Sequence, residues 1–146
     1  MPKGFNIQSD WTTRLARRLK ALGPQYGDIV AAEIADTAIR IERQAAQWAP
    51  KDYGFLSNSI KAEKRTGMEW QVTCQVKYAA YVEFGTGTRV EIPRGLESYA
   101  KQFMAPRPVK REVNLPARPF FFPAYREGIK GLNERLRAEI AKAGRK

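Results

Sequence analysis

The chain of 146 residues contains no histidine and a single cysteine, Cys74. Histidine is the commonest general base and the commonest metal ligand in proteins, so its absence argues against most kinds of active site. A lone cysteine forms no internal disulfide and cannot build a cysteine-rich zinc site. The sequence therefore predicts a protein without a cofactor or a metal, made and kept in a reducing cytoplasm.

Long apolar runs are also missing from the sequence. No segment approaches the roughly 20 apolar residues that a membrane helix needs, and the N-terminus, "MPKGFNIQSDW", lacks the apolar core of a secretory signal. The chain is nevertheless 43% hydrophobic and 11% aromatic, which is too rich for a disordered protein. We therefore expect a single folded domain over residues 1–146 with no membrane partner.

The formal net charge of +11 is unevenly distributed along the chain. Residues 28–88 carry 7 basic and 8 acidic side chains, whereas residues 1–27, 89–118 and 119–146 each carry a net charge of +4. This pattern predicts a neutral folding core with basic appendages. Such appendages attract nucleic acid or acidic protein surfaces.

Hydrophobic periodicity predicts three helices. The first begins at Asp10 and stops at Gly23. The second opens near Asp28 and ends before Pro50, because a residue that precedes proline disfavours the helical conformation. The third starts around Pro123, which suits a first helical turn. Its apolar stripe consists of Ile129, Leu132, Leu136 and Ile140.

The stretch "EWQVTCQVKY" alternates apolar and polar side chains. This alternation predicts a strand over residues 70–78 with Cys74 toward the core. A turn at Gly67 separates it from a second strand over residues 58–65, and the pair is typical of an antiparallel hairpin. Upstream, "KDYGFLSNSI" predicts a turn centred on Gly54.

Residues 86–118 show no long periodic pattern and contain four prolines. A connection of this length is unusual inside a compact domain, so we interpret it as a functional insertion with a short helix around "LESYAKQFM". It separates a basic N-terminal arm (1–27) and a core of helix plus hairpin (28–85) from an aromatic segment with the C-terminal helix (119–146). The predicted fold class is α+β: a small antiparallel sheet of roughly three to five strands, packed by the long helix and the C-terminal helix, with a long basic loop insertion.

The stretch "EFGTGTRV" resembles a phosphate-binding loop only superficially. A P-loop needs a lysine followed by serine or threonine after its last glycine, and a dinucleotide fingerprint needs a third glycine where Val90 stands. We therefore expect Gly85 and Gly87 to supply positive φ where the chain ends a strand and begins an assembly loop.

Glu83 stands beside Tyr81 and Phe84 and is the acidic residue most suggestive of chemistry. A carboxyl group among aromatic side chains can have a raised pKa and act as a general acid. Ser57 and Ser59 have no histidine to activate them, and no second acid or metal-binding cluster accompanies Glu83. We therefore favour a role in which Glu83 caps backbone amides or pairs with an arginine, including one across a subunit boundary, and predict that the protein is not an enzyme.

Basic residues are candidates for contacts with phosphates or with an acidic partner, and the sequence leaves both alternatives open beside an ordinary solvated face. The first set lies on one face of the first helix: Arg14, Arg17 and Lys20. The second set lies in the insertion: Arg107, Lys110 and Arg111. No helix-turn-helix, RNA-recognition or zinc-finger signature strengthens the nucleic-acid alternative.

The three successive phenylalanines at 120–122 cannot all point the same way in an extended chain. They form either a short crossing strand buried on two faces or an aromatic anchor inserted into a neighbouring subunit. With the basic residues of the insertion, they define a candidate assembly interface. It comprises Arg94, Arg107, Lys110, Arg111, Phe120 and Phe121.

Three stretches resemble, in the same order, the motifs of one family. They are "WAPKDYGFLSNSI", "YAAYVEFGTGT" and "PARPFFFPAY". Together with the helix before Pro50 they cover about residues 28–142, and three short motifs in order are a fairly specific signal. The chain thus resembles the small tail-completion, or neck, proteins of long-tailed bacteriophages and prophages.

The resemblance implies that the shared motif residues form the fold and that none is catalytic. The clearest are Pro50, Gly54, Tyr81, Glu83, Phe84, Gly85, Pro119 and Pro123. It also implies a structural virion protein at the head–tail junction, present in the host cytoplasm during assembly and working as a ring of about six copies. The expected neighbours are head-closure and tail-terminator or tail-tube proteins, with duplex DNA in the channel as a further candidate contact. The alternative is a small basic protein that binds nucleic acid without sequence preference.

Overall fold

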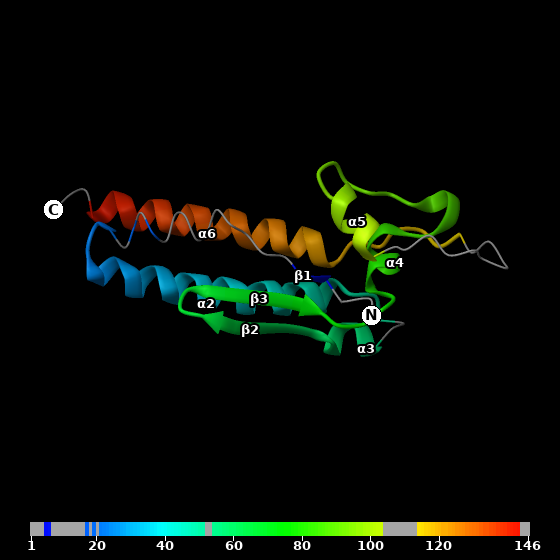
Figure 1. Cartoon of the computed structure of the whole chain (residues 1–146), viewed down its shortest axis with the longest axis horizontal. Coiled ribbons are helices and arrows are strands. Elements are labelled where there is room, and N and C mark those ends of the chain that lie inside the picture. Colours follow the sequence, from blue (N-terminus) through cyan, green and yellow to red (C-terminus); the bar gives the residue numbers. More distant parts are fainter. Residues whose placement is uncertain are drawn as a thin grey trace.

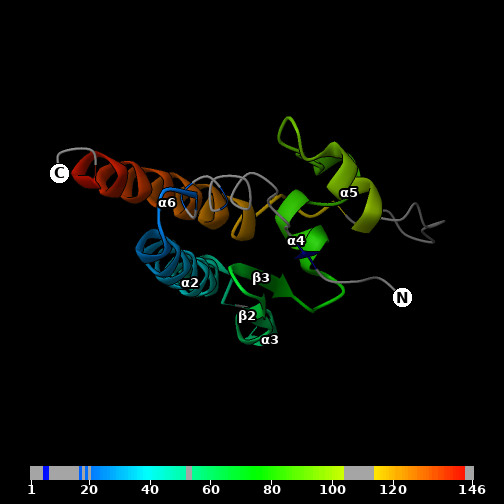
Figure 2. The same cartoon turned by 60° about the vertical axis from the view of Figure 1, so that its left-hand side comes forward.

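Two long helices run side by side in opposite directions and form the framework of the protein (Figure 1). They are α2 (Pro24–Trp48) and α6 (Phe121–Ala143). The computed structural model describes residues 5–6, 17, 19, 21–51, 54–103 and 114–143. A small sheet lies against α2 on the side away from α6, and short helices gather at the N-terminal end of α6 (Figures 1 and 2).

The sheet has three antiparallel strands in the order β1-β3-β2. The strands are β1 (Phe5–Asn6), β2 (Ile60–Thr66) and β3 (Glu69–Cys74). In the β2–β3 hairpin Ile60 lies opposite Cys74, and Gly67 supplies the positive φ of 49° in the connecting turn. The predicted hairpin and the α+β fold class are therefore confirmed.

Helix α2 follows its hydrophobic pattern closely. Pro24 occupies its first turn, and the helix ends at Trp48, two residues before Pro50. One stripe of its side chains is buried, with Val30, Ile34, Thr37, Ala38, Ile41 and Ala45 among its members. The stripe is wide because α2 packs against α6 on one side and against the sheet on the other.

The apolar residues form two clusters along α2. The larger lies where α2, the sheet and the start of α6 meet, and it contains fully buried Leu56, Cys74 and Phe84. The smaller lies toward the other end of the helix pair, where Leu132 and Leu136 of α6 pack against α2. Cys74 therefore lies in the core, as its alternating strand pattern predicted.

Four short elements complete the described chain. They are α3 (Gly54–Asn58), α4 (Ala79–Phe84), the 3-10 helix η1 (Gly87–Arg89) and α5 (Glu97–Phe103). The helix expected around "LESYAKQFM" is confirmed by α5. In the views of Figures 1 and 2, α4 and α5 lie beside the start of α6, whereas α3 lies across the sheet from it.

Three local predictions were wrong. Gly54 begins the short helix α3 instead of centring a turn, and β3 ends at Cys74 instead of continuing to residue 78. Glu83 and Phe84 end the helix α4, not a strand. The physical reason is packing, since the buried residues Ala79, Ala80, Glu83 and Phe84 have the spacing of one helical face.

The polar face of β3 is also more covered than its alternation predicted. Gln71 is buried and accepts a hydrogen bond from Arg65 of β2. Since a buried amide needs a partner, this cross-strand bond compensates for the loss of water around Gln71.

Candidate assembly surface

The carboxylate of Glu83 joins two of the sequence motifs. It is buried at the end of α4, where its Oε2 accepts hydrogen bonds from the backbone amides of Phe120 (2.8 Å) and Phe121 (3.0 Å). Its Oε1 accepts one from the amide of Phe122 at 3.1 Å. Glu83 therefore caps α6 from a distant part of the chain, which is the structural role that we favoured over a general acid.

This cap provides hydrogen-bond acceptors for most of the backbone amides that lack a partner at the start of α6. The first four amides of a helix have no partner within the helix, and here Phe121 and Phe122 are the first two residues. Pro123 is the third and has no N–H to satisfy. A carboxylate at this end is also favoured by the helix dipole. The "VEF" and "PFFFP" motifs thus encode the two halves of one junction.

Burial raises the pKa of Glu83 above its ordinary value of 4.5, because the charged form loses its water. The hydrogen bonds from Phe120, Phe121 and Phe122 and the positive charge of Arg126 act in the opposite direction, and desolvation is the larger effect. Both carboxylate oxygens are occupied by backbone amides, so the arrangement offers no proton to an outside molecule.

Gly85 turns the chain out of this junction. It has a φ of 80°, and a Cβ at this position would lie 2.9 Å from the amide of Ala117 and 2.9 Å from the carbonyl of Leu115. The carbonyl of Arg89 would be closer still. Only glycine fits here, both for its backbone angle and for the close approach of three backbone groups.

Both ends of the insertion are fixed by hydrogen bonds to each other. The Thr86 amide donates to the Leu115 carbonyl at 3.0 Å, and the Leu115 amide donates to Thr86 Oγ1 at 2.9 Å. The Thr88 amide donates to Asn114 Oδ1 at 2.9 Å, and the Arg118 amide donates to the Val82 carbonyl at 2.8 Å. Residues 85–91 and 114–118 therefore form a fixed base for the segment between them.

This base and the residue that follows its first part expose apolar side chains that we call the insertion surface: Val90, Ile92 and Leu115. Their exposed fractions are 38%, 37% and 44%. Exposed basic residues, Arg89 and Arg94, stand in the same segment. An apolar centre with a charged rim is typical of a protein–protein contact.

A second exposed apolar side chain is Phe55 of α3, with 83% of its surface accessible. Its neighbour Leu56 is fully buried, so the short helix turns one residue into the core and the other out. A phenyl ring with this much of its surface accessible is a candidate contact for a partner.

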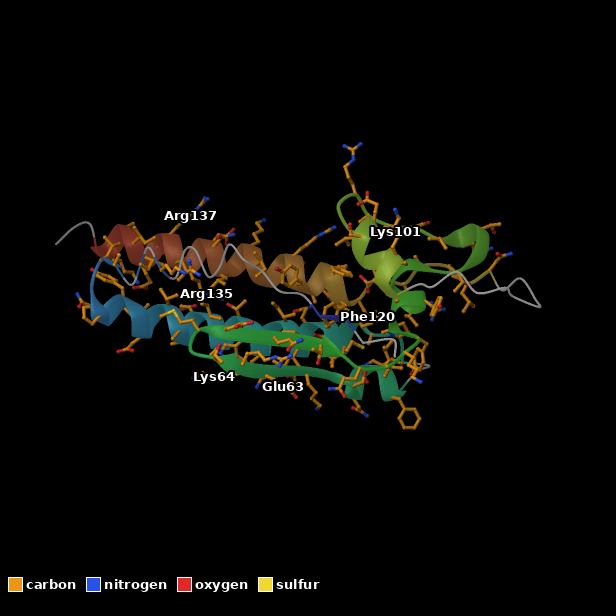
Figure 3. All side chains as sticks on the ribbon, viewed as in Figure 1. Glu63, Lys64, Lys101, Phe120, Arg135 and Arg137 are labelled. Atoms are coloured by element: carbon orange, nitrogen blue, oxygen red, sulfur yellow. The ribbon has the colours of Figure 1, made fainter. Side chains whose placement is uncertain are left out.

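The structure corrects one part of the predicted assembly interface. Phe120 and Phe121 have no accessible surface, and with Phe122 they pack in the core at the N-terminal end of α6 (Figure 3). Of the two alternatives for this segment, burial within the chain holds, but Phe121 and Phe122 begin helix α6 and do not form a crossing strand. Neither residue is available as an anchor for a neighbour.

The structure describes only some of the basic residues that the sequence suggested as contacts. Arg94 and Arg17 are exposed. The remaining candidates lie outside the described residues: Arg14, Lys20, Arg107, Lys110 and Arg111. The fold-forming candidates lie at element boundaries or in α4. They are Pro50, Gly54, Gly85, Pro119 and Pro123 at the boundaries, and Tyr81, Glu83 and Phe84 in α4.

Sequence reasoning missed Phe55, because an aromatic residue next to a leucine suggests burial of both. No local pattern separates Phe55 from Leu56, because only the packing of the short helix α3 turns one side chain outward and the other inward. It also missed the ion pair between Arg135 of α6 and Glu33 of α2, whose nitrogen and oxygen are 2.6 Å apart.

Residues 13–85 match a family model described as "Bacteriophage HK97-gp10, putative tail-component". The chain belongs to this family. The match spans α2, the hairpin and α4 and ends at Gly85, where the insertion begins. No curated protein and no solved structure matches the chain. Family membership indicates a structural tail component of a phage particle and suggests a protein that is not an enzyme.

Within the described part of the chain, no helix is both long and apolar enough to cross a membrane. Among the same residues, no three of the side chains that commonly bind metals are grouped so as to hold an ion.

Proposed function

We propose that this tail component acts at the head–tail junction, where it completes the tail and joins it to the head as a ring. Its partners in this proposal are further copies of itself, head-closure proteins, and tail-terminator or tail-tube proteins. The observation that carries the proposal is the junction at Glu83. It fixes the base of a long insertion to a rigid two-helix core and leaves apolar residues exposed on that base.

This arrangement separates a supporting body from the surfaces that would contact neighbours. A helix pair with a sheet on one side provides a body that keeps its shape when it is loaded by neighbours. A ring requires head-to-tail contacts, in which one surface of each subunit meets a different surface of the next. Phe55 lies on α3, whereas the insertion surface lies beyond α4. The two therefore offer different contacts.

Deletion of the gene from a phage or prophage that encodes this protein tests the proposal. We expect the mutant lysate to contain DNA-filled heads and separate tails, with few joined particles in electron micrographs. The full-length protein supplied from a plasmid restores joining. Normal particles from the deletion mutant, or a block in head formation before DNA packaging, would contradict a role at the junction.

The nucleic-acid alternative has fewer observations behind it. Of the basic residues on the first predicted helix, Arg17 is exposed, and its two companions are outside the described residues. In the proposed ring, duplex DNA is therefore a secondary contact within the channel.

A further inference from the structure

A hollow of about 150 Å³ lies between α2 and α6. Its floor is formed by Ile41, Ala124, Gly128 and Gly131, and its rim by Arg40, Gln44, Glu127 and Arg135. We call it the α2–α6 hollow. A cavity of this volume is large enough for a benzene ring.

The hollow opens away from the sheet. Glu42 marks the sheet side of α2, because its Oε2 accepts a hydrogen bond from the amide of Ala62 in β2 at 2.6 Å. Arg40 and Gln44 are two residues away in either direction, and two residues correspond to about 200° of helical rotation. The rim of the hollow is therefore on the opposite flank of α2.

Two guanidinium groups on the rim pair with carboxylates. Arg40 Nε lies 2.6 Å from Asp36 Oδ2. Arg135 reaches from α6 toward α2 (Figure 3), where its Nε lies 2.6 Å from Glu33 Oε2 and its Nη2 donates to Thr37 Oγ1 at 2.7 Å. A planar guanidinium stacks favourably on an aromatic face.

The two glycines in the floor have different reasons to be there. A Cβ on Gly128 would collide with Ile41, approaching its Cγ1 and lying 2.7 Å from its Cδ1, so the contact between the helices requires glycine. A Cβ on Gly131 would meet only Arg135 Nη1, at 3.1 Å, which is the end of a flexible side chain. Glycine inside a helix costs roughly 1 kcal/mol relative to alanine. Among the described residues only this guanidinium comes close to Gly131, so glycine at this position leaves room for it and keeps the hollow open to an incoming group.

An aromatic group of suitable size is present in the chain itself. Phe55 is 83% exposed, and its helix α3 lies across the sheet from α6, whereas the hollow opens on the flank away from the sheet (Figure 2). Because Phe55 and the hollow face different directions, a copy that places Phe55 in a neighbour's hollow still has its own hollow free. Such a contact is head-to-tail, as a ring requires.

We propose that the α2–α6 hollow receives the phenyl ring of Phe55 from a neighbouring copy of this chain. The inference rests on the proposed function insofar as it names the contact that closes the ring. Ile41 and the two glycines contact the ring edge, and the guanidinium groups of Arg40 and Arg135 lie against its faces. Gly131 keeps the hollow open.

The test uses two variants of the full-length, nuclease-treated protein. Phe55→Ala removes the inserted ring, and Gly131→Leu fills the hollow without entering the helix contact. Sedimentation velocity over a concentration series measures self-association. We expect each variant alone to associate roughly 30-fold more weakly than the wild type, or worse, as for the loss of a central aromatic contact. Ile39→Ala, which shortens an exposed apolar side chain elsewhere on α2, is the matched control and should associate like the wild type.

Mixing the two variants gives the sharper result. Phe55→Ala retains an intact hollow, and Gly131→Leu retains an intact Phe55. An equimolar mixture should therefore form a 1:1 dimer that cannot add a further copy. Unfolded variants would not produce this complex, and circular dichroism checks that both remain helical.

Three outcomes would overturn the inference. A wild type that assembles while both variants assemble equally well would show that the ring uses another contact, and the proposed junction role would stand. A wild type that stays monomeric at all concentrations would remove Phe55 as a self-contact, and the deletion phenotype would then decide the function separately. Loss of assembly by both variants without a mixed dimer would also contradict this pairing.

Discussion

The backbone amide of Phe120 donates a hydrogen bond of 2.8 Å to the carboxylate of Glu83, which lies 37 positions earlier in the chain. Two further amides share this carboxylate. The bond closes the insertion at its base and simultaneously caps α6. A single buried side chain therefore determines both where the insertion begins and how the C-terminal helix is docked.

Replacement of Glu83 by alanine should lower the free energy of unfolding by about 3 kcal/mol or more, because three buried amides would lose their acceptor at a cost of about 1–3 kcal/mol each. Urea unfolding followed by circular dichroism measures this loss. Glu91→Ala removes an exposed carboxylate nearby and should change stability by less than about 0.5 kcal/mol. Equal stability of the two variants would show that the cap contributes little.

The pH dependence of stability should reveal the environment of Glu83. Since burial raises its pKa in the folded state, the folded protein holds this proton more tightly than the unfolded chain. The corresponding stability is fully present below the ordinary pKa and is lost as pH rises through the raised value. Relative to Glu83→Gln, which cannot ionise, the wild type should therefore lose stability with increasing pH above about 4.5.

Urea unfolding at a series of pH values measures this difference, with Glu91→Gln as a control that keeps Glu83. If the wild type instead gains stability relative to Glu83→Gln as the pH rises over the same range, the prediction is wrong. In that case the three amides and Arg126 outweigh desolvation, and the pKa of Glu83 is lowered.

The two glycines of the α2–α6 hollow form a matched pair for stability. Gly128→Ala should destabilise the protein by about 1–3 kcal/mol, because Ile41 must move and the helices must separate. Gly131→Ala should stabilise it by up to about 1 kcal/mol, since alanine favours the helix and its Cβ meets only a movable guanidinium. Thermal unfolding of both variants measures the contrast. Destabilisation by Gly131→Ala would show that this glycine serves the fold of the monomer.

Periodicity predicted the parts of the fold that depend on one element at a time. The stripe of α2, the alternation around Cys74 and the apolar residues of α6 each carry their own signal. The stretch "YAAYVEF" was different, since an apolar and aromatic run fits a strand or a buried helix equally well. Its helical form is favoured by packing of Phe84 against Phe122, which follows the insertion.

The candidate site was predictable only in outline. Sequence reasoning gave Glu83 a capping role but not its partners, because the first of these amides lies 37 positions later in the chain, beyond the insertion. For Phe120 and Phe121 it left two alternatives open, burial in the chain or insertion into a neighbouring subunit. The choice between them depends on which residues cover the two sides of this segment. The exposed Phe55 and the hollow beside Gly131 arise from the packing of α3 and of the helix pair, which no local pattern encodes.

The insertion surface should matter for joining heads to tails but not for folding. Leu115→Ser introduces a polar side chain at a position that is 44% exposed, so the free energy of unfolding should change by less than about 0.5 kcal/mol. In complementation of the deletion mutant, the same variant should reduce the yield of joined particles. Ile39→Ser alters an exposed apolar residue on α2 and serves as its control. Joining at the wild-type level by Leu115→Ser would place the partner contact elsewhere.

Salt dependence separates the junction role from the nucleic-acid alternative. A protein whose main task is to bind duplex DNA releases a counterion for nearly every phosphate that it neutralises, so its affinity falls steeply and linearly on a log–log plot against salt. A junction protein should instead show weak DNA binding and a self-association that nuclease treatment leaves unchanged. Fluorescence anisotropy with a labelled duplex at several salt concentrations measures the first quantity, and sedimentation measures the second. Tight binding with a slope near −4 or steeper, together with a monomer after nuclease treatment, would favour the nucleic-acid alternative, because such a slope corresponds to about four or more phosphate contacts.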